Sequence, residues 1–206
     1  MHPEQTQAKE HLILAAARKR FAYYGFSKVT MDEIASDVGL AKPSLYYYFP
    51  TKEGLFRAVI AHEQGKFVAD IETMLSRAAG SGEKLRALID LRVRLFRELV
   101  NLSALGVDSW AEVSSLFKDL FRNLEEQELK FLGAILAAGN DAGELDVANP
   151  QQTAKLILHA LHGLRLRAIH ADRGPHVTDG AYADLKRDSD HLIELLLNGM
   201  QRPSSH

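Results

Sequence analysis

Apolar positions recur at three- and four-residue spacing along almost the whole chain, which indicates helices rather than strands. Residues 7–24 show the pattern, and Gly25 is a natural stop. The apolar residues expected to form one helix face there are Leu12, Ala16, Phe21 and Tyr24, with Ile13 and Ala17 beside them. Similar spacing predicts further helices over about residues 31–38, 42–48, 52–77, 81–100, 109–118, 118–138, 150–171 and 178–198. We therefore expect an all-α fold of about nine helices.

Side chains that can cap a helix precede several of these segments. Thr and Glu at positions three apart can each satisfy an orphan backbone N–H, and Pro is tolerated in a first turn. The expected caps are Thr30 with Glu33, Thr51, Ser109 with Glu112, Asn149 before Pro150, and Thr178. The segment 81–100 is apolar nearly all round, so we expect that helix to be central and buried.

Charge divides the chain unevenly. Residues 1–60 hold 8 Lys and Arg against 6 Asp and Glu, whereas residues 61–206 hold 17 against 21. An anion-binding surface is therefore expected in the first part. The boundary is expected within the fourth helix, which gives a first unit over residues 1–52, a second over 53–200 and a disordered tail over 201–206.

The composition excludes several kinds of functional site. The chain has 206 residues, a net charge of −2 and no cysteine, which excludes disulfide frameworks, thiolate metal sites and cysteine nucleophiles. The polar N-terminus lacks the apolar core of a secretion signal. No window approaches the roughly 20 consecutive apolar residues of a membrane-spanning helix. The expected location is the cytoplasm.

Two short helices joined by Gly39 describe a helix-turn-helix. Ile34, Ala35 and Val38 would face inward from the first helix. The second helix begins with Lys42, Pro43 and Ser44, which are side chains suited to base edges in a major groove.

An aromatic run, LYYYF, ends this second helix. Leu45 and Phe49 are four residues apart and would face the core. The three tyrosines between them spread round the other sides, where their hydroxyls can donate to phosphate oxygens. The alternative is a fully packed core, which would require a short helix enclosed on every side.

The run VTMDEIASDVGLAKPSLYYYFPTKEGLF, residues 29–56, resembles the DNA-binding signature of TetR-type transcriptional repressors. The resemblance covers about residues 7–60 and implies an Ω-shaped helical homodimer that binds a palindromic operator and is released by a small molecule. It makes residues 1–52 a helix-turn-helix DNA-binding domain and residues 53–200 a ligand-binding and dimerisation domain. It assigns base contacts to Lys42, Pro43, Ser44 and Tyr47, and phosphate contacts to Thr30, Tyr46, Tyr48 and Lys52. Ala41 departs from the family, which often has a capping Ser or Thr there.

Candidate ligand-binding residues lie in the second domain. Bulky aromatic side chains favour an apolar or aromatic effector, although aromatic residues on helices are more often core. His159 and His162 could line a pocket, contact a partner chain or bind a metal, and Arg165 and Arg167 could meet an anion or form a solvated face. The aromatic candidates are Phe96, Trp110, Phe117, Phe121 and Phe131.

One-sided apolar stripes on the last two helices suit a four-helix dimer interface or packing within the chain. They are formed by Leu156, Ile157, Leu161, Leu164, Leu192, Leu195 and Leu196.

The expected function is a ligand-responsive repressor with no cofactor or metal. A regulator without a sensor cavity is the first rival, and a packed second domain would favour it. An enzyme is the second rival, but the sequence holds no nucleophile elbow, P-loop or metalloprotease motif.

Overall fold

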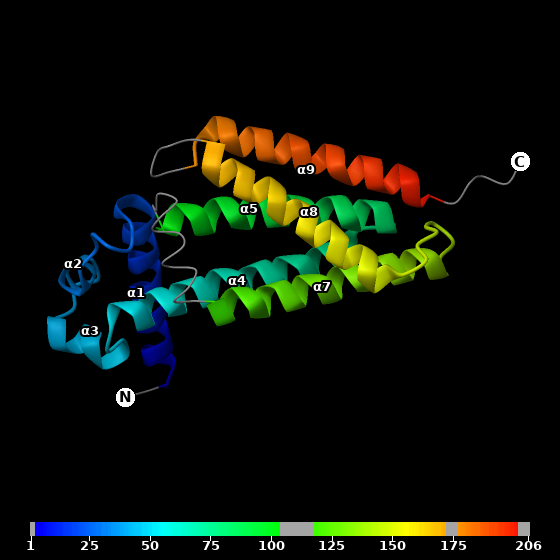
Figure 1. Ribbon diagram of the computed structural model, residues 1–206. Coiled ribbons are helices and arrows are strands. Elements are labelled where there is room, and N and C mark those ends of the chain that lie inside the picture. The colour runs from blue at the N-terminus through cyan, green and yellow to red at the C-terminus, as the bar shows by residue number, and fades with distance from the viewer. Residues whose placement is uncertain (1–2, 104–117, 172–176, 202–206) are drawn as a thin grey trace, which may run out of the picture.

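The computed structural model describes residues 3–103, 118–171 and 177–201, and these contain eight helices (Figure 1). Three helices form an N-terminal unit at one end of an elongated molecule, and the C-terminus lies at the other end. The helices are α1 (Pro3–Tyr24), α2 (Met31–Asp37), α3 (Lys42–Tyr48), α4 (Lys52–Arg77), α5 (Ser81–Ser103), α7 (Lys118–Asp141), α8 (Pro150–Ala171) and α9 (Asp179–Met200).

The expected all-α fold is confirmed. α7 begins at Lys118, where a break was expected, while the expected cap at Ser109 lies outside the described residues. Three helices run a few residues past their expected ends: α5 continues to Ser103, α7 to Asp141 and α9 to Met200. Of the predicted tail 201–206, the description includes Gln201 alone.

Polar caps fix the helix starts that the sequence indicated. Thr30 accepts from the Glu33 amide, and the Glu33 carboxylate accepts from the Thr30 amide at 2.8 Å, so the capping box is complete. Thr51 and Thr178 cap α4 and α9 through their hydroxyls, which accept from the Gly54 and Ala181 amides. Asn149 accepts from the Gln152 amide at 3.0 Å at the start of α8.

The core of the N-terminal unit includes the start of α4. Phe21 of α1 and Phe56 of α4 meet edge to face with ring centroids 5.0 Å apart, and both rings are fully buried. Ile34 of α2 and Leu45 of α3 are buried in the same cluster, which continues into the rest of the molecule. α4 is therefore shared between the two predicted domains, whose boundary was placed at its first turn.

α5 lies at the centre of the larger unit and packs against α1, α4, α7 and α9. Its side chains Leu85, Leu88 and Ile89 are buried, as its apolar pattern indicated. A second, smaller apolar cluster joins α5 to α8 and α9. In the described part of the chain, no helix is long and apolar enough to cross a membrane.

Candidate nucleic-acid interface and ligand cavity

The turn between α2 and α3 depends on a glycine. Gly39 has φ of 65°, a left-handed conformation that side chains with a Cβ rarely adopt. The backbone closes around it, since the Leu40 amide donates to the Ala35 carbonyl at 2.9 Å. Arg20 of α1 holds α2 through Asp37 (Nη2–Oδ1 2.8 Å), and this hydrogen bond lowers the pKa of the Asp37 carboxyl. The turn thus joins α3 to α2, and the pair of Arg20 and Asp37 joins α2 to α1.

The N-terminal end of α3 is open to solvent. Lys42, Pro43 and Ser44 are all exposed, and Ala41 provides no side-chain cap, as expected from its methyl group. Tyr47 is 74% exposed. The four residues predicted to face bases therefore lie together on one accessible end of the molecule.

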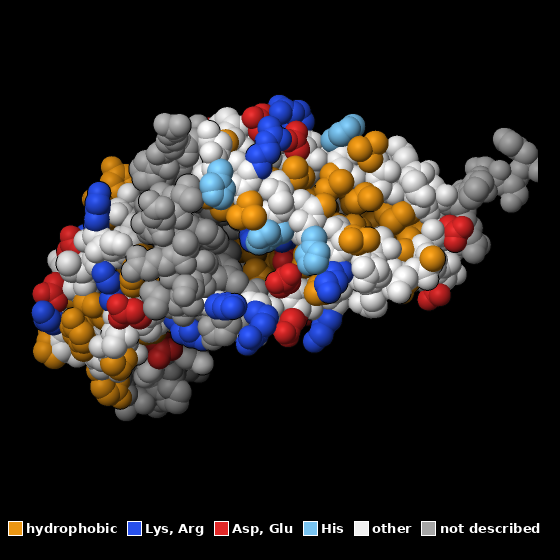
Figure 2. All heavy atoms as spheres, viewed as in Figure 1, with side chains coloured by type: hydrophobic (Ala, Val, Ile, Leu, Met, Phe, Trp, Pro, Cys, Tyr) orange, Lys and Arg blue, Asp and Glu red, His pale blue; other side chains and the backbone are white. Residues whose placement is uncertain are grey.

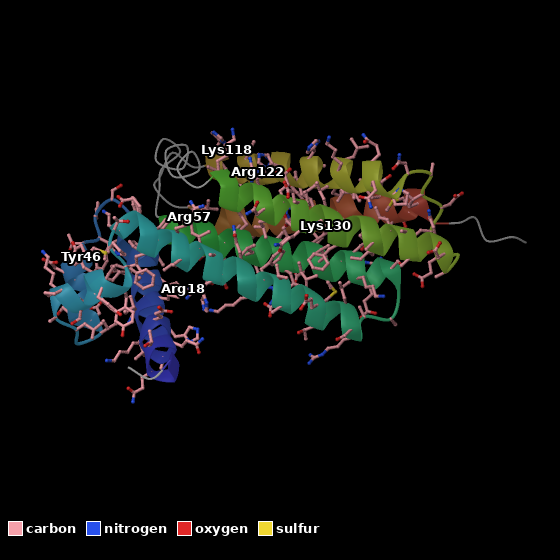
Figure 3. The ribbon with its side chains drawn as sticks, turned by 90° about the horizontal axis from the view of Figure 1, so that it is seen from below. Arg18, Tyr46, Arg57, Lys118, Arg122 and Lys130 are labelled. Atoms are coloured by element: carbon pink, nitrogen blue, oxygen red, sulfur yellow. The ribbon has the colours of Figure 1, made fainter. Side chains whose placement is uncertain are left out.

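The aromatic run divides between core and surface. Leu45 is fully buried, and Phe49 and Tyr48 are partly buried against the same core. Tyr46 remains 37% exposed, and Figure 3 places it at the far end of the N-terminal unit. The sequence argument for Leu45 and Phe49 is confirmed. Tyr48 differs from the other tyrosines, because its ring packs against the core and meets Tyr47 edge to face at 5.5 Å.

Lys42 has an acidic neighbour on the same surface. Its Nζ donates to Asp32 Oδ2 of α2 at 2.9 Å, which raises the pKa of the Lys42 ammonium. Both side chains are more than half exposed. A phosphate or base that binds Lys42 must therefore compete with the Asp32 carboxylate.

The Lys52 ammonium is hydrogen-bonded to backbone carbonyls of the protein itself. Its Nζ donates to the carbonyls of Phe26 and Val29 at 3.0 and 3.1 Å, and to that of Ser27 at 3.4 Å. It also lies 4.6 Å from the centroid of the Phe26 ring. Its ammonium thus ties the loop after α1 to the start of α4, and its phosphate contact stays a prediction. Thr30 ends the same loop and is exposed, although its hydroxyl is engaged with Glu33.

A small cavity lies among α5, α7, α8 and α9. Its volume is about 40 Å³, and its walls are largely apolar. Four polar side chains also face it. The lining residues are Ile89, Arg92, Val93, Leu95, Phe96, Leu124, Glu128, Leu161, Arg165, Leu185 and Ser189.

A buried ion pair forms one side of this cavity. Arg92 Nε of α5 lies 2.8 Å from Glu128 Oε1 of α7, and both side chains are largely buried. Burial raises the pKa of the Glu128 carboxyl, although the charges of Arg92 and Arg165 oppose that rise. The Nη1 atom of Arg92 is buried and has no hydrogen-bond partner in the described structure.

Arg165 of α8 forms another side. Burial, and after it the charge of Arg92, lower the pKa of its guanidinium to about 10. Nη2 of Arg165 lies 2.8 Å from His162 Nδ1, and its guanidinium carbon lies 5.9 Å from the centroid of the Phe96 ring. Two buried atoms, Arg165 Nε and Ser189 Oγ of α9, find no hydrogen-bond partner among the described residues.

Only some of the predicted ligand-binding residues that the structure describes lie at the cavity. Phe96 lines the cavity, and His162 contacts the cavity arginine Arg165. Phe131 is packed against the main core, and His159 is an exposed residue of α8 outside the cavity lining. Three of the predicted positions lie outside the described side chains: Trp110, Phe117 and Phe121.

The sequence argument missed Arg92, Glu128 and Ser189. Arg92 stands four residues before Phe96, on the same side of a helix, and that spacing was a usable signal. Glu128 and Ser189 gave no such signal, because their burial depends on packing between helices. Among the described residues, no three His, Cys, Asp or Glu side chains gather closely enough to hold a metal ion.

The outer face of α8 and α9 carries exposed apolar side chains. Leu156 and Leu195 are each 58% exposed and Leu166 is 38% exposed. Figure 2 shows apolar side chains gathered over these two helices. Ile157 and Leu161 of the predicted interface are instead buried within the chain.

Comparison with known proteins gives consistent matches. The family model for bacterial regulatory proteins of the tetR family matches residues 13–59. The crystal structure of a transcriptional regulator from Cytophaga hutchinsonii ATCC 33406 is 35% identical with a TM-score of 0.86, covering 93% of this chain and 98% of that chain.

Curated relatives agree with these matches. The HTH-type transcriptional regulator RutR of Escherichia coli (strain K12) is 26% identical over 150 residues, which is 73% of this chain and 70% of that protein. The fatty acid metabolism regulator protein of Bacillus subtilis (strain 168) is 22% identical over 197 residues, covering 96% and 98%.

Proposed function

This chain belongs to the TetR family of transcriptional regulators, and from that premise we propose that it is a repressor controlled by a small molecule. Members of this family are DNA-binding proteins and not enzymes. In our proposal two copies bind a palindromic operator, and an effector in the second domain releases them. The observation that carries the proposal is the pairing of an exposed reading helix, α3, with a cavity whose central helix, α5, packs on the reading unit.

We assign base contacts to Lys42, Pro43, Ser44 and Tyr47, at the exposed end of α3. A lysine can donate to guanine O6 and N7, and a serine can pair with several bases. Phosphate contacts are assigned to Thr30, Tyr46, Tyr48 and Lys52, which surround that end. Because DNA binding requires access to the chromosome, the proposed location is the cytoplasm.

We propose that α8 and α9 form the homodimer interface. Leu156, Leu166 and Leu195 place apolar surface outside the single chain, where a partner would cover it. Gly163 and Gly199 add open space, since nothing lies within 4 Å of where a Cβ would stand. The four helices of two copies could therefore approach closely. A two-fold dimer would present two copies of α3 to two half-sites.

Coupling between cavity and DNA would pass through α5. Arg92 and Phe96 face the cavity, while Glu98 lies 3.5 Å from Arg18 of α1. Leu95 lines both the cavity and the adjoining hollow between α1, α4 and α5. A ligand that favours another position of α5 would shift the population toward another spacing of the two reading helices. The buried polar atoms of the cavity-lining residues that find no partner in the described part of the chain support this sensor over a regulator without one.

The proposal is tested by selecting binding sites from random double-stranded DNA with the purified full-length chain. We expect an inverted repeat whose half-site centres are about one helical turn, or a multiple of it, apart. Native mass spectrometry of the selected complex should then show two chains per duplex. Enrichment of no sequence, or of a single half-site bound by one chain, would contradict the proposal.

A further inference from the structure

Three of the residues that line the cavity carry a buried polar atom without a hydrogen-bond partner among the described residues. These atoms are Arg92 Nη1 of α5, Arg165 Nε of α8 and Ser189 Oγ of α9, and each is buried with no hydrogen-bond partner within the described ranges. Buried polar atoms are nearly always hydrogen-bonded in folded proteins. All three can donate a hydrogen bond, so together they form a set of donors that lacks an acceptor.

The charge of the residues that line the cavity also indicates that an anion would bind there. Two guanidinium groups face it, and the one carboxylate among its lining residues is Glu128, which is paired with Arg92. Glu125 is close enough to influence Arg165 but is exposed to solvent. His162 offers Arg165 a neutral acceptor at Nδ1, because a guanidinium has no atom that accepts. The cavity lining therefore has an excess of positive charge.

The remaining walls are apolar. Leu124, Leu161, Leu185 and the ring of Phe96 line the same space. Its volume of about 40 Å³ exceeds the roughly 10–15 Å³ that a cavity needs to hold one water, but it is far below the roughly 300 Å³ or more of an open ligand pocket, so it has room for a carboxylate and not for a whole drug-sized ligand. The apolar part of a ligand must therefore push side chains apart as it enters, including those of α5.

We propose that the effector is a monocarboxylate with an apolar body, whose carboxylate is bound by Arg92, Arg165 and Ser189. The planar guanidinium fork matches the two oxygens of a carboxylate, and the hydroxyl supplies a third donor. A phosphate or sulfate would satisfy the donors but would leave the leucines and Phe96 without an apolar partner. This inference rests on the proposed function for its role in regulation, but the site itself can be tested without DNA.

The test is isothermal titration calorimetry on the full chain with two matched probe pairs, benzoate against benzamide and butanoate against butanamide. Each amide keeps the shape of its acid and removes the charge. We expect at least one carboxylate to bind about tenfold more tightly than its amide, in line with hydrogen bonds to a charged group. Sulfate should bind more weakly than that carboxylate.

Arg165→Met should abolish the preference for the carboxylate. Arg167→Met is the matched control, because Arg167 is an exposed residue two positions along α8 that pairs with Asp188, and it should leave the preference intact. Ser189→Ala removes one buried donor with little change in volume and should weaken carboxylate binding several-fold. Circular dichroism checks that each variant is folded.

Several results would overturn the inference. They are equal affinity for acid and amide in both pairs, sulfate binding as tight as carboxylate binding, or a folded Arg165→Met that keeps the preference. If Arg165→Met does not fold, the inference is tested by the two probe pairs on the parent chain and by carboxylate binding to Ser189→Ala.

DNA affinity measured with and without the bound carboxylate separates the two proposals. Carboxylate binding through Arg165 with unchanged DNA affinity would uphold the anion site and refute release by effector. Intact operator binding without any carboxylate preference would refute the anion site but would not contradict the proposed repressor function.

Discussion

Arg18 of α1 lies against Glu63 of α4, with Nε 3.0 Å from Oε1, and the Glu63 side chain is almost completely buried. Figure 3 shows Arg18 on α1 where that helix passes α4. Burial alone would raise the pKa of Glu63, but a hydrogen bond with Glu98 and the charges of Arg18 and Lys66 bring that pKa below its ordinary value. The reading unit is thus joined to the cavity-bearing unit by a buried ionised group.

Arg18→Met should loosen this junction. Breaking a buried pair usually costs 3–5 kcal/mol, but Arg18 is 41% exposed and Lys66 remains near Glu63, so we expect a loss of about 1–2 kcal/mol in unfolding free energy. Operator affinity should fall as well, because the orientation of α1 is less well fixed. Arg94→Met is the control, since Arg94 pairs with Asp90 on its own helix. Equal effects of both changes in urea unfolding and DNA titration would refute this role.

Asp32→Asn should strengthen DNA binding. The change frees Lys42 from a carboxylate 2.9 Å away and removes a negative charge from the proposed DNA surface. We expect a gain of about three- to fivefold at low salt, which shrinks as salt screens the surface. Asp70→Asn removes the same charge from an exposed site on α4 and should change little. Fluorescence anisotropy at two salt concentrations measures both, and weaker binding by Asp32→Asn would count against the assignment.

Lys52→Met should destabilise the fold. Three backbone carbonyls lose their donor, and we expect about 1–3 kcal/mol less unfolding free energy. Lys28→Met, an exposed change in the same loop, should stay within about 0.5 kcal/mol of the parent chain. Thermal unfolding compares the two variants. An unchanged melting temperature for Lys52→Met would show that its carbonyl contacts contribute little.

Gly163→Arg should give a folded monomer. A side chain at this position meets no atom of its own chain, and arginine favours helix over glycine by about 0.5–1 kcal/mol. In the proposed dimer the same side chain would stand between two copies. Gly65→Arg is the control, since Gly65 is an equally open position on α4. Analytical ultracentrifugation should show a monomer for the first variant and a dimer for the second, whereas two dimers would place the interface elsewhere.

Local rules explain which parts of this structure the sequence could predict. The Thr30 and Glu33 capping box, the turn at Gly39 and the burial of Leu45 each depend on residues within a few positions of one another. α7 runs past its expected end at Ala138 because Gly139 stays within the helix, and the left-handed turn comes later, at Gly143.

Contacts between distant segments could not be predicted in the same way. Lys52 has a charge and a position suited to phosphate, but its carbonyl partners lie 23 to 26 residues earlier in the chain. The cavity donors Arg92, Arg165 and Ser189 come from three helices that meet only after folding. Phe131 is a ligand candidate by its residue type alone; its ring is partly buried against the main core, and its contact with a ligand stays a prediction.

The most direct test of the central claim is an anisotropy titration of the selected inverted repeat and a scrambled duplex with the parent chain and Lys42→Ala. We predict that the parent chain prefers the repeat by about a thousandfold or more at physiological salt. Lys42→Ala should reduce that preference roughly tenfold, with little change on the scrambled duplex, because a base contact carries sequence information. Equal affinity of the parent chain for both duplexes would contradict the account.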